Sequence, residues 1–390
     1  MASYIPFVNR KLDAELVRRH YSNARLIRVP LAAGLDSTKK QLPSEVPLWV
    51  DPRAEVFHSW PMNVDPKTQK FFKGFKHADD IGDTGFQKRP ERDAVRDFVL
   101  GVLDKCNSVK PAWLSVPQLP LLDGGGRNKI NRQLAEASAD WYSRSGFKGR
   151  FILPVIFTNQ RQLNSKTTRN TKLEQVLKCY SLAKAQGVWV VDPTLADDAG
   201  SSTLDKRFKG LISMHEELKA KVPMSSLFVG GPYWGLNLVL WVRGLVTNPA
   251  VGVTSFQYSL PRSSVFSHSE RIALSPLRRR AHVNSLDRWL RDALGVIEKS
   301  NPAHSELKRL LKLIDVAVPA RNYDYDQIAD MYSSWLDRLE RFPAPGRALA
   351  LYQDLSSAFV LGRSLPDLPK KERTARKPER VAQQLMLHCL

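Results

Sequence analysis

The segment RFILPVIFTNQRQLNSKTTRNTKLEQVLKCYSLAKAQGVWVVD, residues 150–192, holds the clearest structural pattern in the chain. The apolar run Arg150–Phe157 predicts a buried strand, and Thr171–Gln186 predicts a helix that ends at Gly187. Val188–Asp192 then predicts a second strand. A strand, a helix and a strand in this order are typical of a parallel sheet covered by helices.

The same alternation extends through the first two thirds of the chain. Further strands are predicted at Ala24–Leu31, Val46–Asp51, Trp113–Val116, Ser226–Gly230 and Val251–Tyr258. Further helices are predicted at Arg92–Lys105, Lys129–Ser145, Asp205–Lys221 and Asn237–Val246. Seven or eight such units favour an α/β fold of the TIM-like (β/α)8 barrel type, with an open flavodoxin-like sheet as the alternative. No GxGxxG motif follows the first strand, which disfavours a Rossmann fold.

The pattern changes beyond about Leu260. Four helical stretches follow, at Leu286–Lys299, Ser305–Asp315, Tyr325–Arg341 and Pro345–Phe359. We therefore expect the barrel to span residues 1–262 and a helical, basic domain to span 263–364. Residues 365–390 are charged and contain proline, and we expect a mobile tail there.

The chain is strongly basic, with 59 Lys and Arg against 39 Asp and Glu in 390 residues and a net charge of +20. This excess favours a polyanionic partner, and we expect nucleic acid, in particular double-stranded DNA. No apolar stretch is long enough to cross a bilayer, so we expect no membrane partner. The cysteines are far apart and lack metal-ligand spacing. We therefore expect a cytoplasmic protein without a metal or cofactor, and the oligomeric state stays open.

Basic residues gather in a few parts of the chain. Those between 127 and 184 face few acidic residues, and Lys73 and Lys76 alternate with Phe71, Phe72 and Phe75. Such aromatic rings either stack on unpaired bases or hold their loop against the protein. The residues predicted to contact a nucleic-acid backbone are Lys73, Lys76, Arg127, Lys129, Arg161, Lys166, Arg169, Arg278, Arg279 and Arg280.

Polar residues follow the predicted strands, where the active site of a (β/α)8 barrel lies. Asp51 and Asp192 come directly after apolar runs and are the candidate catalytic residues, because a carboxylate stabilises an oxocarbenium-like sugar or activates water. An Asp at a strand end before proline also caps helices or fixes turns, which is the alternative. The candidates for binding a base are Gln118, Asn159, Gln160, Gly230, Gly231, Tyr233, Trp234 and Gln257.

Several of these strand ends resemble the tRNA-guanine transglycosylase superfamily, particularly its DNA-acting branches. The likeness rests on Asp51 after VPLWV, on Phe157–Gln160, on Val229-Gly230-Gly231 and on GVTSFQY at Gly252–Tyr258. The resemblance implies a barrel that breaks the N-glycosidic bond of a flipped nucleotide. Gln257 occupies the position of the nucleophilic Asp of that family, and the zinc-binding Cys/His cluster is missing. Both departures indicate a hydrolytic relative.

We therefore expect a DNA glycosylase that removes a flipped base by hydrolysis. The resemblance further implies a modified base such as a glucosylated cytosine, a role in anti-phage defence, and a bacterial or phage-related host cell. A transglycosylase that exchanges a base in tRNA or DNA is one alternative, which Gln257 disfavours. A non-catalytic nucleic-acid-binding subunit is the other.

Overall fold

The computed structural model describes residues 3–61, 64–83, 91–121, 125–159, 161–193, 195, 202–223, 225–254, 258, 271–283, 285–315, 325–370 and 376–390. The chain divides into two compact units. The barrel unit comprises Met1–Thr194, Arg207–Pro232 and Leu245–Phe266. The C-terminal unit comprises Leu195–Lys206, Tyr233–Gly244 and Ser267–Leu390.

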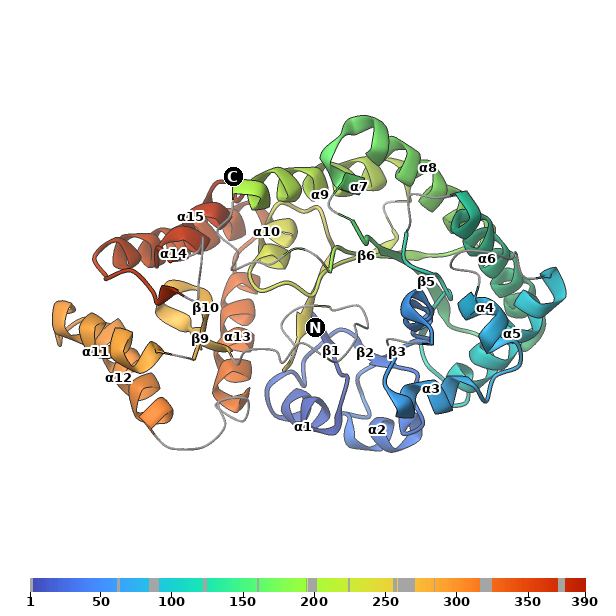
Figure 1. The fold of residues 1–390 in the computed structure, drawn as a ribbon, viewed down its shortest axis with the longest axis horizontal. Coiled ribbons are helices and arrows are strands. Elements are labelled where there is room, and N and C mark those ends of the chain that lie inside the picture. Colours follow the sequence, from blue (N-terminus) through green and yellow to red (C-terminus); the bar gives the residue numbers. More distant parts are fainter. Residues whose placement is uncertain are drawn as a thin grey trace. The chain divides into compact units, whose positions relative to one another are not determined.

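Eight parallel strands close into a barrel in the order of the sequence (Figure 1). They are β1 Ile5–Phe7, β2 Ile27–Pro30, β3 Leu48–Asp51, β4 Trp113–Ser115, β5 Arg150–Ile156, β6 Gly187–Val191, β7 Leu227–Gly230 and β8 Asn248–Gly252. The predicted (β/α)8 barrel is therefore confirmed. Strand β1 was not predicted because three residues are too few to show an alternating pattern, and β8 begins earlier than expected.

Helices lie outside the strands of the barrel unit (Figure 1). They are α1 Lys11–His20, α2 Leu35–Gln41, η1 Ala54–Ser59, α3 Pro66–Phe72, α4 Ala78–Asp83, α5 Arg92–Asn107, α6 Gly125–Ser145, α7 Arg161–Asn164, α8 Lys166–Leu182 and α9 Ser202–Lys221. Local chemistry sets their ends. Ser165 caps α8 by accepting a hydrogen bond from the Thr168 N–H at 3.1 Å, and Gly146 follows α6 with φ +66.

Three aromatic rings fill the interior of the barrel. Phe7, Trp49 and Trp189 come from β1, β3 and β6 and meet pairwise edge to face, with ring centroids 5.4–5.5 Å apart. Such contacts stabilise beyond the area that they bury. Because all three side chains are buried, the barrel has a packed core and not a pore.

The phenylalanines near residue 70 hold their segment to the barrel unit. Phe72 is fully buried and packs edge to face on Phe57, and Phe71 and Phe75 contact Phe72 in turn. Because the Phe72 ring is not accessible, it does not stack on an unpaired base in this structure.

The C-terminal unit is largely helical, as predicted, and has its own core. Its helices are α10 Leu236–Val242, α11 Leu286–Val296, α12 Pro302–Asp315, α13 Tyr325–Glu340, α14 Ala344–Arg363 and α15 Arg380–Met386. An unpredicted antiparallel pair, β9 Arg271–Leu274 and β10 Arg279–His282, lies among them. Leu277, Leu286, Trp289 and Leu290 are in the core.

Two of the predicted domain limits differ from these units. Helix α10 follows β7 in sequence but belongs to the C-terminal unit, where Asn237 accepts a hydrogen bond from Tyr332 at 3.0 Å. The described part of 365–390 is packed instead of forming a free tail. Leu365 and Leu368 join the core, and α15 packs on α14, because this segment carries an apolar face that its charged composition obscures.

No helix in the described parts of the chain is long and apolar enough to cross a membrane.

Candidate active site at the mouth of the barrel

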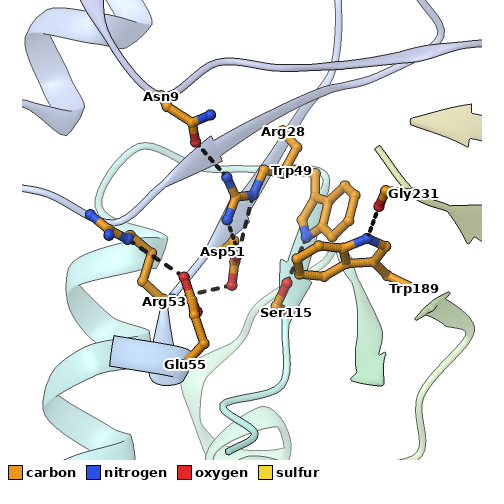
Figure 2. A network of polar contacts seen from close by, with 9 residues as sticks. All are labelled: Asn9, Arg28, Trp49, Asp51, Arg53, Glu55, Ser115, Trp189 and Gly231. Atoms are coloured by element: carbon orange, nitrogen blue, oxygen red, sulfur yellow. Dashed lines mark hydrogen bonds and ion pairs between the residues drawn. The ribbon is translucent and has the colours of Figure 1, made fainter. Parts of the chain in front are cut away.

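A buried ion pair links the second and third strands. Arg28 lies in β2, and both its Nε, at 3.1 Å, and its Nη2 donate to Oδ2 of Asp51, the last residue of β3. Its Nη1 donates to Asn9 Oδ1 at 2.9 Å, just after β1 (Figure 2). The guanidinium also lies over the Phe7 ring, 5.0 Å from its centroid. These contacts satisfy a charge that burial would otherwise penalise heavily.

A second arginine and a second carboxylate lie beside this pair. Arg53 adopts a left-handed backbone with φ 58, and its N–H donates to Asp51 Oδ1 at 3.2 Å. Its Nε lies 3.6 Å from Oε1 of Glu55, in the short helix η1 (Figure 2). Non-glycine residues with a left-handed backbone are uncommon, and they are found preferentially at functional sites. Arg53 therefore touches both carboxylates, through its backbone and through its side chain.

The environment of Glu55 favours its neutral form. Burial raises the pKa of its carboxyl group above the usual value, and the nearby negative charge of Asp51 raises it further. Arg53 and Arg28 oppose this rise. Glu55 is therefore able to hold a proton beside a carboxylate that is engaged in an ion pair.

Tyr258 adds a third group. Its ring meets Trp189 edge to face at 5.1 Å, and its buried hydroxyl has no hydrogen-bond partner among the described residues. Burial and the charges of Glu55 and Asp51 raise the pKa of this hydroxyl well above its usual value. Tyr258 therefore remains a donor near the two carboxylates.

The floor of the site is fixed by indole hydrogen bonds. Trp49 Nε1 donates to Ser115 Oγ at 2.8 Å, and Trp189 Nε1 donates to the Gly231 carbonyl at 2.6 Å (Figure 2). Gly231 has φ +93, a conformation that favours glycine. The Gly230-Gly231 pair therefore serves the packing of the barrel, and the Gly231 carbonyl is not available for a base.

Asp192 lies in a separate ion pair. It is fully buried after β6, and its Oδ2 accepts from Arg207 Nη2, on α9, at 3.2 Å. Strands β3 and β6 are separated by β4 and β5 in the barrel order. The two predicted catalytic aspartates thus each have their own arginine, and the acidic neighbour of Asp51 is Glu55.

The other predicted base-binding residues have structural partners or lie outside the description. Gln118 is buried, and its Nε2 donates to the carbonyls of Pro117, at 2.8 Å, and Asn131, at 3.0 Å. Half-buried Asn159 accepts from the Arg161 N–H at 2.9 Å, at the start of α7. The amide donors of Gln118 are therefore already used. Gln160 and Gln257 lie outside the described residues.

Tyr233 and Trp234 are core residues of the C-terminal unit and do not form a stacking surface. Both are buried, and Trp234 Nε1 donates to the Arg278 carbonyl at 3.2 Å. The Trp234 ring lies 5.1 Å from Tyr332. Their aromatic faces are covered, so the prediction that they bind a base is not supported.

Exposed basic side chains occur at helix starts that follow β4 and β5. Lys129 lies near the start of α6, Arg161 begins α7 and Lys166 begins α8, and all three are exposed. In a (β/α)8 barrel these helix starts lie at the same end as the strand terminus that carries Asp51 and the helix η1 that follows it with Glu55. This end of the barrel unit therefore combines carboxylates with exposed cations.

Four of the other predicted phosphate-binding residues have partners within the protein. Arg279 is fully buried and donates to the Lys377 carbonyl at 3.0 Å, and Arg278 lies over the Trp335 ring at 4.4 Å. Arg169 donates to the Leu163 carbonyl at 3.1 Å. Lys76 pairs with Asp97 at the surface, Lys73 is exposed and Arg280 is half-buried. The side chain of Arg127 lies outside the description.

The residues that complete the network escaped prediction from sequence. Arg28 interrupts an apolar run between Ile27 and Val29 and faces the barrel interior. A charged residue inside a buried strand was therefore the signal that could have identified it. Glu55 lies four residues after Asp51 and therefore does not follow a strand directly, which is where candidates were sought. No group of His, Cys, Asp and Glu side chains that would hold a metal occurs within the described residues.

Comparisons with known proteins do not assign a family or a function to the chain. No protein-family model and no curated protein matches the sequence. Among solved structures, the carboxyl transferase domain of Rhizobium etli pyruvate carboxylase, determined with pyruvate, matches with a TM-score of 0.38 and 8% identity. The match covers 99% of this chain and 62% of that chain, so this chain spans less than two thirds of its neighbour. The closed ring of eight parallel strands by itself makes the protein a (β/α)8 barrel protein.

Breaking the Arg28–Asp51 pair should be costly, and replacing both members should not. Asp51→Leu or Arg28→Met alone should lower the free energy of unfolding by about 3–5 kcal/mol, because each leaves a buried charge without its partner. The double variant Arg28→Met/Asp51→Leu should lose much less stability than the sum of the two single losses. Urea unfolding measures all four proteins. Additive losses would show that the pair is not coupled.

Glu55→Gln should change the pH dependence of stability. Because the folded-state pKa of Glu55 is raised, its contribution is complete below the ordinary Glu pKa and is lost as pH rises through the folded value. Relative to the parent, the variant should therefore gain stability between pH 4 and pH 8, by about 1.4 kcal/mol per unit of pKa elevation. Thermal unfolding at both pH values measures this. Exposed Glu45→Gln is the control, and an equal response of both variants would contradict the assignment.

Proposed function

We propose that the protein is a nucleic-acid glycosylase that hydrolyses an N-glycosidic bond at the mouth of the barrel. The observation that carries the proposal is the pair of neighbouring carboxyl groups, one in a buried ion pair and one with a raised pKa. Glycosidic hydrolysis needs an acid for the leaving group and a negative charge for the oxocarbenium-like sugar. When two carboxyl groups have different environments, the one with the higher pKa serves as the acid and the ionised one stabilises the positive charge.

Glu55 is the proposed general acid. It gives its proton to the leaving base as the bond between the base and C1′ breaks. Asp51 stabilises the positive charge that develops on the sugar, and its Oδ1, which accepts one backbone hydrogen bond, receives a proton from the attacking water. The water oxygen bonds to C1′, so the products are a free base and an abasic site. The proton on Asp51 then passes to Glu55 by way of solvent, which restores the general acid and the carboxylate.

The substrate follows from charge and from the resemblance to DNA-acting transglycosylase relatives. A net charge of +20 and the exposed Lys129, Arg161 and Lys166 near the mouth suit a phosphodiester backbone. A modified base in DNA, such as glucosylated cytosine in phage defence, is the most specific form of the proposal. Base exchange would need a covalent nucleophile, and Gln257 stands at the position that carries the nucleophilic Asp in the family that the chain resembles.

Base release should depend on Asp51 and Glu55. Purified protein should release bases and leave alkali-labile abasic sites in a panel of normal and phage-modified DNAs, as measured by mass spectrometry and strand cleavage. Asp51→Asn and Glu55→Gln should each reduce the rate by about 100-fold or more. Glu45→Gln should keep full activity. Unchanged rates in both site variants would reject the mechanism, and binding without release from any DNA would favour a non-catalytic subunit.

Binding to DNA should depend on the position of the cationic side chains, and not on the net charge alone. Arg161→Gln/Lys166→Gln should flatten the slope of log K against log salt by about 1.8, since each phosphate contact contributes about 0.9. Arg144→Gln/Lys148→Gln removes the same charge from exposed positions at the other end of α6. That control should leave the slope unchanged. Equal slopes for both double variants would place the DNA elsewhere.

A further inference from the structure

Arg28 and Arg53 differ in how many of their side-chain hydrogen-bond donors a ligand could still use. Arg28 is 2% exposed, and its guanidinium is engaged by Asp51, Asn9 and two aromatic rings. The Arg53 side chain is 26% exposed. Its Nε forms an ion pair with Glu55 at 3.6 Å, a distance beyond a good hydrogen bond, and its charge also helps to lower the pKa of Asp65. Arg53 therefore has hydrogen-bond donors to spare, while Arg28 does not.

The position of Arg53 is fixed although its side chain is loosely held. Its backbone N–H is tied to Asp51 Oδ1, and its left-handed conformation sets the direction of the chain between Asp51 and Glu55. A forked guanidinium that is anchored at its backbone and reaches solvent suits a tetrahedral oxyanion, because its donors match two phosphate oxygens.

We propose that Arg53 binds the phosphate next to the scissile nucleotide and leaves Glu55 when it does so. The substrate of the site is then a phosphodiester, and not a neutral nucleoside or sugar. Arrival of the phosphate removes the cation that opposes protonation of Glu55 and brings a negative charge close to it. Binding of the correct substrate thus secures the proton that the general acid needs. This inference rests on the proposed function for the identity of the acid.

The charges around Glu55 are consistent with this exchange. Arg53 and Arg28 oppose its protonation, whereas Asp51 promotes it. The Tyr258 hydroxyl also interacts with Glu55. On the neighbouring α4, Asp79 accepts from the Trp60 indole at 2.9 Å and Asp80 contacts His77 at 2.7 Å, so both have other partners.

The test uses dimethyl phosphate, which keeps one negative charge across the pH range, and the full-length protein. The Glu55 carboxyl carbon, assigned in ¹³C-glutamate-labelled protein by comparison with Glu55→Gln, reports both binding and the titration midpoint. Sodium chloride at equal ionic strength is the blank. In the parent protein, dimethyl phosphate should shift the midpoint of Glu55 to higher pH.

Arg53→Asn removes the cation with a residue that tolerates the left-handed backbone. In this variant the midpoint of Glu55 should start higher and should not respond to dimethyl phosphate, and the affinity for this probe should fall about tenfold or more. Arg144→Gln, which removes an exposed arginine from the last turn of α6, should respond like the parent. A parent protein that does not respond, or an Arg53→Asn variant that responds fully, would overturn the inference. Because no turnover is measured, failure of base release would reject the proposed function without affecting this result.

Discussion

The ion pair between Arg28 and Asp51 is the constraint around which the mouth of the barrel is built. Two charges at 2–3% exposure are tolerable only because each has several partners. Arg28 reaches Asn9 after β1, and Asp51 accepts from the Arg53 N–H that leads into η1. One interaction therefore connects the ends of β1, β2 and β3 and fixes where the next acid, Glu55, can lie.

This arrangement gives the mouth two sides with different chemistry. The acids and the buried arginine come from β2, β3 and the turn after β3. Just after β1, Arg10 Nε donates to Thr254 Oγ1, which lies just after β8, at 3.0 Å. The exposed cations follow β4 and β5. Strands β8, β1, β2 and β3 are consecutive in the closed barrel, so the carboxylate side and the cationic side are adjacent arcs of one rim. A polyanion held on one arc would present a sugar to the other.

The barrel could be predicted from sequence because its strands are apolar runs between amphipathic helices, and a buried parallel strand has that signature. The site was predicted less well. Asp51 stands at a strand end and was visible there, but its partner Arg28 belongs to another strand, and such pairing depends on register. Tyr233 and Trp234 follow β7 in sequence but pack in the C-terminal unit, because α10 packs there on α14. A position directly after a strand therefore does not distinguish a site residue such as Asp51 from core residues such as Tyr233 and Trp234.

Glu55 holds its proton to higher pH than an ordinary glutamate, beside an ion-paired Asp51. The most direct measurement is the pH at which the Glu55 carboxyl titrates, followed by ¹³C NMR of the ligand-free protein with Glu55→Gln for assignment. Because burial and Asp51 raise the pKa of Glu55, its carboxyl should lose its proton above the ordinary pH range of a glutamate. Titration of Glu55 within that range, or below it, would contradict this arrangement.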